Sequence, residues 1–351
     1  SRFNQNQTGN FHIFPTQPLY SLDHSDNSFY IDLLMDGNFI GTINSTDLIN
    51  IYKNLKNKIT QIEIHHTMGF KMNFIIDLLQ HFKSQTKLFW IHDFFSICPN
   101  YFLMRNDREY CKAPDVESNA CQICLYGKSR EKHLNEFTHL FTSIKMHIIS
   151  PSEFALEFWK KKSGLKAEEY SVFPHAILNW KEQNIPLATQ KRIKIAYVGN
   201  PIYQKGWYTF KKLTEILNEN FHYKFFQFSN DDQKGNFEFI EVAVTKSNRF
   251  LMKEELLRNQ IDVAILWSLC PETFSFTLYE SLAAGCYIVT NPYSGNIQNY
   301  LRNNPKRGLI VENEEALIHL FSSGKIIEAV KKYQNNGKPT ADFIINDEKI
   351  V

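Results

Sequence analysis

The sequence lacks any long apolar run. It contains no 18 consecutive apolar residues, and its opening, SRFNQNQTGN, is polar and has no apolar signal core. A helix that spans a membrane needs about 20 mostly apolar residues, and a secretory signal needs an apolar core of its own. The sequence therefore predicts a cytoplasmic protein without a membrane span. Because the first residue is not Met, we also expect the chain to be one module of a larger multidomain protein.

The sequence also has little net charge. Its 39 Lys and Arg against 37 Asp and Glu leave +2, whereas a nucleic-acid-binding domain usually carries a concentrated basic patch. We therefore expect no nucleic acid partner. Hydrophobic residues make up 43% of the 351 residues, which is enough for two domains of ordinary size, each with its own core.

Residues 261–290 change their periodicity in an order that indicates a ligand site. The apolar, partly β-branched run Ile261–Leu266 predicts a buried strand of a parallel sheet. Pro271 disfavours helix at the residue before it, so the next helix is predicted to begin between Thr273 and Ser275. The first amides of such a helix face the carboxyl end of the strand, where open α/β sheets bind ligands, and they favour phosphate.

Two glutamates mark this unit, Glu272 in the loop and Glu280 about two turns further along the helix. Taken alone, Glu272 is explained as a partner of the helix dipole and Glu280 as a solvated helix residue. The surrounding PETFSFTLYESLAAG, however, closely resembles the donor-site signature of retaining glycosyltransferases of family 4. The resemblance implies that Glu272 contacts the donor sugar as a catalytic residue and that Glu280 binds the nucleotide ribose. It also implies that amides near Ser275 and Phe276 hold the diphosphate.

A second segment, VGNPIYQKG, has a glycine that permits a close turn and a lysine where the next helix begins. This is weak evidence for phosphate by itself. The segment resembles the opening of the second domain in the same family, where a Gly-Arg pair and a Lys-Gly pair hold the donor diphosphate. Gly199, Lys205 and Gly206 match, but Asn200 stands where the family has arginine. We assign Gly199, Asn200 and Lys205 to the nucleotide-sugar site.

In the amino-terminal half, strand and helix patterns alternate over residues 59–94 at the length typical of a parallel sheet. His65 and His66 follow one predicted strand, and His92 with Asp93 follows the next. A histidine in such a place is more often packed or hydrogen-bonded than catalytic. The segments IHHTMG and IHDFFSICPN are similar to a branch of family 4 in which an HD dipeptide points toward the reacting sugar. The resemblance implies that His92 is a catalytic-site residue, with His66 and Asp93 as acceptor-side candidates.

Four cysteines lie in a polar, proline-containing loop. Two of them form a CxxC, and the other two precede it within about 25 residues, a set that can supply four thiolates to a structural zinc ion. Free thiols in a reducing compartment and a disulfide in an oxidising one are the alternatives. The four residues are Cys98, Cys111, Cys121 and Cys124.

Phe158 and Trp159 precede three lysines. This pattern fits a helix that rests on an anionic membrane surface, and it also fits a solvated helix with two packed aromatic side chains. We therefore keep peripheral contact with the inner membrane face as a hypothesis.

The resemblance implies an α/β protein with the GT-B fold, in which two facing Rossmann-like domains with parallel sheets enclose a cleft. We place an acceptor-side domain at residues 1–185, including the cysteine loop at 98–124. The donor-binding domain is expected at 186–338 and a tail at 339–351.

The implied activity is that of a retaining glycosyltransferase of the hexosyltransferase type. It would move a sugar from a UDP- or GDP-sugar to a glycan or lipid-linked acceptor, in bacterial surface polysaccharide or glycoconjugate synthesis, without a catalytic metal. Two alternatives remain open: a non-catalytic nucleotide-sugar or glycan-binding module of an assembly protein, and a sugar-nucleotide epimerase of the same fold.

Overall fold

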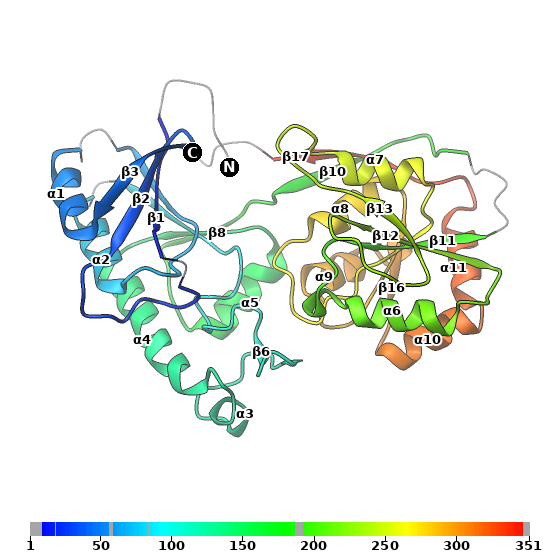
Figure 1. The fold of residues 1–351 in the computed structure, drawn as a ribbon, viewed down its shortest axis with the longest axis horizontal. Coiled ribbons are helices and arrows are strands. Elements are labelled where there is room, and N and C mark those ends of the chain that lie inside the picture. Colours follow the sequence, from blue (N-terminus) through cyan, green and yellow to red (C-terminus); the bar gives the residue numbers. More distant parts are fainter. Residues whose placement is uncertain (1–8, 18, 56–58, 83–84, 187–191, 347–351) are drawn as a thin grey trace. The chain divides into compact units, whose positions relative to one another are not determined.

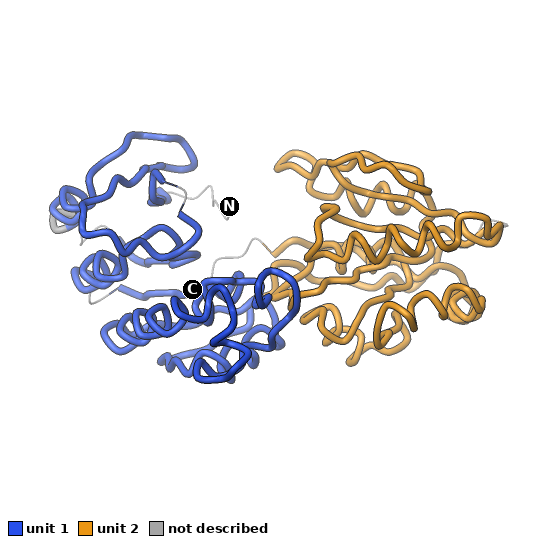
Figure 2. The backbone as a smooth tube through the Cα atoms, turned by 60° about the horizontal axis from the view of Figure 1, so that its bottom comes forward, with its two compact units in different colours: residues 1–173, 347–351 blue, residues 174–346 orange. Residues whose placement is uncertain are grey.

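The computed structural model describes residues 9–17, 19–55, 59–82, 85–186 and 192–346. The chain divides into two compact units, one within residues 1–173 and one over residues 174–346 (Figure 2). Each unit contains a parallel sheet of its own, as the alternation of strand and helix patterns predicts.

The first unit is built on four parallel strands in the order β4-β5-β8-β9, and a three-stranded antiparallel sheet β1-β2-β3 comes before it in the chain (Figure 1). A turn at Asp36 and Gly37 joins β2 to β3, and both residues have positive φ. The strands are β1 Phe11–Pro15, β2 Tyr30–Met35, β3 Asn38–Asn44, β4 Gln61–Ile64, β5 Thr86–Trp90, β6 Met104–Arg105, β7 Glu109–Tyr110, β8 His147–Ser150 and β9 Glu169–Val172. The helices are α1 Ser45–Leu55, α2 Met72–Gln80, α3 Asn119–Gln122, α4 Gly127–Ser143 and α5 Glu153–Ser163.

The helix α5 carries the aromatic pair that precedes three lysines. Trp159 is fully buried, and its indole N–H donates to Ser96 Oγ at 2.9 Å. The Phe158 ring packs against Phe94, with 4.7 Å between the ring centroids. Core packing therefore explains both aromatic side chains, and the membrane-surface hypothesis draws no support from them.

The second unit has six parallel strands in the order β13-β12-β11-β14-β15-β16. Successive side chains of β11 point to opposite faces, so Ile195 and Tyr197 pack with α6, α10 and α11, while Ala196 and Val198 pack with α7, α8 and α9. The strands are β10 Ala176–Trp180, β11 Ile193–Val198, β12 Tyr223–Ser229, β13 Glu238–Glu241, β14 Val263–Ile265, β15 Tyr287–Thr290, β16 Gly308–Ile310 and β17 Ala341–Ile345. The helices are η1 Tyr203–Lys205, α6 Trp207–Ile216, α7 Leu251–Arg258, α8 Phe276–Ala283, α9 Asn296–Asn303, η2 Pro305–Arg307, α10 Glu314–Ser322 and α11 Lys325–Tyr333.

The strands β10 and β17 change the expected domain limits. They pair antiparallel, and Ala176, Ala341 and Phe343 pack with Ala283 of α8. The units therefore divide after residue 173 rather than after 185, and β17 belongs to the second unit although we expected a tail at 339–351. Residues 187–191, next to the expected domain limit, lie outside the described residues, as do residues 347–351 of the expected tail.

Across the described ranges, no helix combines the length and the apolar character that crossing a membrane requires.

Candidate functional site

The strand order of the second unit creates a place for a ligand beside α8. The chain runs from β11 outward to β12 and β13, then returns to β14 on the other side of β11 and continues to β15 and β16. Open α/β sheets bind ligands at the carboxyl ends of the two strands where this reversal occurs. The loop after β11, which holds Gly199 and Asn200, and the loop after β14, which holds Glu272, both leave the sheet at this point.

The helix α8 begins at Phe276, one residue beyond the range that the sequence predicts. Ser275 is its N-cap, because its Oγ accepts the Leu278 N–H at 3.3 Å. The Ser275 hydroxyl also lies 3.0 Å from Thr277 Oγ1. In the described part of the chain, the N–H groups of Phe276 and Thr277 donate to no protein group. Two free amides at the positive end of a helix favour an anion.

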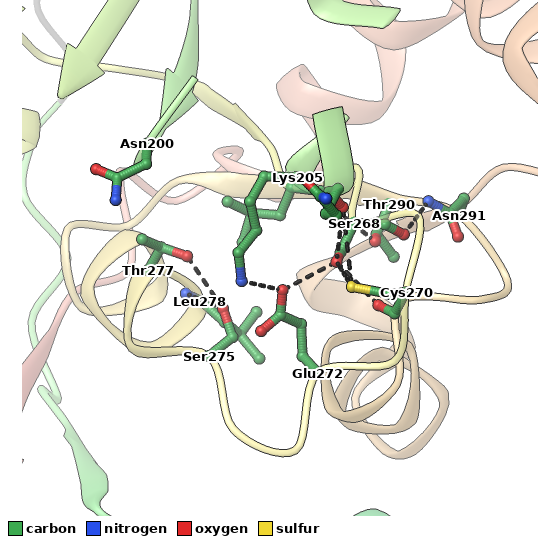
Figure 3. A network of polar contacts seen from close by, with 12 residues as sticks. Asn200, Lys205, Ser268, Cys270, Glu272, Ser275, Thr277, Leu278, Thr290 and Asn291 are labelled. Carbon is green, nitrogen blue, oxygen red and sulfur yellow. Dashed lines mark hydrogen bonds and ion pairs between the residues drawn. The ribbon is translucent and has the colours of Figure 1, made fainter. Parts of the chain in front are cut away.

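Lys205 and Glu272 form an ion pair in front of this helix (Figure 3). Glu272 Oε1 also accepts the Ser268 hydroxyl at 2.9 Å. Burial lowers the pKa of Lys205, but the negative charge of Glu272 and the hydrogen bond to it outweigh the burial and raise this pKa. Lys205 therefore stays protonated at neutral pH, and 39% of its side chain remains exposed.

Main-chain contacts hold the loop of Glu272 in place. The Glu272 carbonyl accepts the Asn296 N–H at 2.8 Å. Gly295 has φ +65°, and a Cβ added there would lie 2.5 Å from the Glu272 nitrogen. Gly206 has φ +75°, and a Cβ there would lie 2.1 Å from the Trp267 carbonyl oxygen. Only glycine fits these close approaches, so the residue next to Lys205 packs directly on the loop that leads to Glu272.

The two other residues of the opening segment lie at the end of β11. A Cβ on Gly199 would lie 3.5 Å from the Thr277 methyl carbon, so this turn lies beside the first turn of α8. The Asn200 carbonyl accepts the Tyr197 hydroxyl at 2.7 Å. Its side chain is exposed and lies apart from the contact of Lys205 with Glu272 (Figure 3). The structure thus brings Lys205 and Glu272 together and leaves the Asn200 amide outside their contact.

Glu280 differs from Glu272 in its surroundings. Only 5% of Glu280 is exposed, and its carboxyl group accepts no hydrogen bond from any described residue. Burial raises its pKa from 4.5 to about 7. A buried carboxyl group without a partner destabilises the fold, so a ligand hydroxyl would supply a hydrogen bond that the chain does not.

In the first unit, the predicted residues His66, His92 and Asp93 meet where β4 and β5 end. His66 Nε2 lies 3.0 Å from Asp93 Oδ2, and His92 Nε2 lies 2.8 Å from His65 Nδ1. His66 and Asp93 also line a small cavity of about 10 Å³.

Sequence reasoning missed Glu63 in the first unit and Ser268 in the second. Glu63 accepts the Trp90 indole N–H at 2.9 Å, and its Oε2 lies 3.3 Å from His65 Nε2. The sequence offered little indication of these contacts, because an acidic residue such as Glu63 inside a strand is normally predicted to face solvent. Ser268, three residues beyond the end of β14, was detectable as a polar residue near a strand end.

The four predicted zinc ligands, Cys98, Cys111, Cys121 and Cys124, line one cavity of about 20 Å³. Arg130 lines it too, and its Nη1 donates to Cys121 Sγ at 3.4 Å. None of the four cysteines forms a disulfide. Burial raises the pKa of Cys98 to about 12. Within the described ranges, no three His, Cys, Asp or Glu side chains are grouped so that they could hold a metal ion. A structural zinc stays a prediction, which metal analysis of the purified protein tests.

We expect Ser275→Ala to lower the free energy of unfolding by about 1 kcal/mol, since the N-cap acceptor is lost. It should also weaken nucleotide diphosphate binding, because the first turn of α8 frays. Asn313→Ala is the matched control, since Asn313 caps α10 by accepting the Ala316 N–H at 2.8 Å. It should cost similar stability and leave binding unchanged. Urea unfolding and calorimetric titration with UDP measure the two effects, and equal binding losses in both variants would contradict the assignment.

Comparison with known proteins gives information on the fold. No protein-family model and no curated protein matches this sequence. Among solved structures, sucrose-phosphate synthase from Thermosynechococcus elongatus is similar over 84% of this chain and 72% of its own, with 13% identity and a TM-score of 0.53. HepE from Anabaena in complex with UDP is similar over 82% of this chain and 76% of its own, with 10% identity and a TM-score of 0.51.

A third solved structure, the pneumococcal O-GlcNAc transferase GtfA in complex with UDP and GlcNAc, is similar over 88% of this chain and 58% of its own. Its sequence is 12% identical and the TM-score is 0.51. Structural similarity at identities this low shows the fold and nothing further. The chain has the GT-B fold, with two Rossmann-like domains that each contain a parallel sheet.

Proposed function

We propose that the chain is a retaining glycosyltransferase of the family 4 type that uses a nucleotide-diphosphate sugar as donor. The observation that carries this proposal is the ion pair between Lys205 and Glu272 in front of the free amides of α8. It lies at the point of the sheet where the strand order reverses, between β11 and β14. One positive charge, two N–H donors and one carboxylate lie together there. Such a set fits a ligand that joins a diphosphate to a sugar.

In this proposal, the amides of Phe276 and Thr277 and the Lys205 ammonium bind the diphosphate. They also stabilise the negative charge that develops on it when the bond to the sugar breaks. Glu272 accepts hydrogen bonds from the donor sugar, Glu280 accepts them from the ribose, and Gly199 lets the backbone approach. His92 orients the donor sugar. The acceptor hydroxyl attacks from the face that the diphosphate leaves, and the leaving phosphate takes the acceptor proton, so a catalytic metal has no part in the proposal.

The donor class has its support in the solved structures. HepE is recorded with UDP and with UDP-glucose, and GtfA with UDP and GlcNAc. We therefore place UDP-sugars first and GDP-sugars second as donors. For the acceptor, we propose a glycan or a lipid-linked sugar in the synthesis of bacterial surface polysaccharide or glycoconjugates, on the cytoplasmic side of the membrane.

A donor panel followed by product analysis tests the proposal. UDP- and GDP-sugars are first screened for a rise in thermal stability, and mass spectrometry then detects transfer to glycan and lipid-linked acceptors. Glu272→Gln is the matched variant, because it keeps the shape of the side chain and removes the charge. It should retain nucleotide binding and lose most of the turnover. The proposal fails if no nucleotide sugar raises the stability of the chain.

The exposed Asn200 favours a second candidate function, a module that binds nucleotide sugars or glycans without catalysis. The resemblance implies a cation at this position, and an amide offers weaker bonds to phosphate than a guanidinium does. Binding without donor hydrolysis or transfer, for every donor and acceptor in the panel, would favour this candidate.

A further inference from the structure

The ends of β4 and β5 carry two separate hydrogen-bonded chains of polar side chains. Ile64 lies opposite Phe89 in the parallel pairing of these strands, so the residues that follow the two strands lie side by side. One chain runs through His66 and Asp93, and the other through His65 and His92. The two chains differ in where their protons can reside.

The contacts of His66 set the tautomer of its ring. Its Nδ1 accepts the Met68 N–H at 2.9 Å, so this nitrogen carries no proton. The ring proton is therefore on Nε2 and is donated to Asp93 Oδ2 at 3.0 Å. Asp93 is held in turn, because its Oδ1 accepts the Phe95 N–H at 2.8 Å. Both ring nitrogens of His66 therefore have a set partner, and this chain has a single arrangement of its hydrogen bonds.

His65 and His92 share one hydrogen bond between two ring nitrogens. His65 Nδ1 lies 2.8 Å from His92 Nε2, and only one of these two atoms can carry the proton of that bond. Stacking restrains the rings, since Trp90 lies parallel to His92 at 1° and to His65 at 19°. Which of the two atoms donates depends on whether the other nitrogen of His65, Nε2, carries a proton.

Glu63 determines that His65 Nε2 carries a proton. Its Oε2 lies 3.3 Å from His65 Nε2. The Trp90 indole donates to Oε2 at 2.9 Å and the Gln61 amide donates to Oε1 at 2.9 Å, so the carboxylate is held in position. The hydrogen bond from His65 is the largest cause that lowers the pKa of Glu63, although burial opposes it. A carboxylate beside His65 Nε2 requires a proton on that nitrogen, and this leaves Nδ1 of His65 as the acceptor for His92.

We propose that Glu63 and His65 are positioning residues that hold the neutral ring of His92 with its proton on Nε2. His12 lies near this chain, and burial followed by the charge of His65 lowers the pKa of His12, while Glu63 and Asp36 oppose this shift. The catalytic consequence rests on the proposed function of His92, but the proton arrangement does not.

Nitrogen-15 NMR of the histidine rings in the ligand-free full chain tests the inference. The spectrum of His65→Gln lacks the signals of His65, and that of His92→Gln lacks the signals of His92, so the two variants assign the signals. We expect a protonated Nε2 on His92 in the parent chain. Glu63→Gln should give mixed tautomers of His65 and His92, because an amide can either accept from or donate to His65 Nε2. This change keeps an acceptor for Trp90, and Glu63→Asp, which draws the carboxylate away from His65, should mix the tautomers to a smaller degree.

Glu169→Gln is the matched control, because Glu169 Oε2 lies 3.5 Å from Nδ1 of another histidine, His147. It should leave the signals of His65 and His92 unchanged. A parent chain with the His92 proton on Nδ1, or unaltered tautomers in Glu63→Gln, would overturn the inference. If the NMR result holds and no sugar transfer is found, the proposed function fails and the positioning inference stands. If sugar transfer is found while the tautomers in Glu63→Gln match those of the parent, the positioning inference fails and the proposed function stands.

Discussion

Glu280→Gln should raise the free energy of unfolding by about 2–3 kcal/mol at pH 8 and leave it almost unchanged near pH 4.5, because one pKa unit corresponds to about 1.36 kcal/mol. The pKa of this carboxyl group rises from 4.5 to about 7 on folding, through burial. Below both values the group is protonated in both states and has no effect. Between them the unfolded chain releases the proton first, so stability falls as the pH rises to about 7 and stays lower above it. Glutamine does not titrate and escapes this loss.

Urea unfolding of the ligand-free chain at the two pH values measures the difference. Glu215→Gln is the control, because Glu215 is an exposed glutamate of α6 in the same unit, and it should change stability by less than about 0.5 kcal/mol. The stabilised Glu280→Gln variant should bind UDP more weakly than the parent, since the ribose loses a charged acceptor. Equal stability of variant and parent at pH 8 would show that Glu280 is not a destabilising buried acid.

Lys205→Ala should weaken binding of UDP by about 1.5–3 kcal/mol, a roughly tenfold to hundredfold loss, the scale for a hydrogen bond to a charged group. The variant removes the one cation that contacts Glu272 within the described residues. It also leaves the Glu272 carboxylate, which is 12% exposed, without its counter-ion next to the bound phosphate. Repulsion between the two negative groups adds to the loss.

Lys212→Ala separates phosphate binding from the loss of an ion pair. Lys212 Nζ lies 2.6 Å from Glu314 Oε1, so this variant also breaks a lysine–glutamate pair of the second unit. Calorimetric titration with UDP should give the parental affinity for Lys212→Ala. The same affinity in Lys205→Ala would mean that the diphosphate binds elsewhere, and the assignment of Lys205 would be withdrawn.

The parallel sheets could be predicted because their signals are local. The Ile261–Leu266 run, the helix signal after Pro271 and the glycine turn at Gly199 all depend on neighbouring residues. The pairing of β10 with β17 could not be predicted, because the strands lie far apart in the sequence and each is short. Without that pairing, the polar segment after Trp180 looked like the natural boundary between the domains.

The candidate site was predictable as a set of residues but not as a set of contacts. The resemblance selected both Lys205 and Glu272, yet it gave them separate parts of the ligand, and their direct ion pair depends on the close approach of Gly206 to Trp267. The contacts of Glu63 were hidden for a similar reason. Its partner Trp90 is on the neighbouring strand, and sequence spacing does not show which side chains face each other across a sheet.

Hydrogen–deuterium exchange of the unmodified chain with and without UDP tests the central claim most directly, because it locates the nucleotide without any substitution. The account predicts slower exchange in the presence of UDP at the amides of residues 199–206 and 272–278, and above all at Phe276 and Thr277, which donate to no group in the described part of the ligand-free chain. Slower exchange confined to other segments while UDP binds would contradict it.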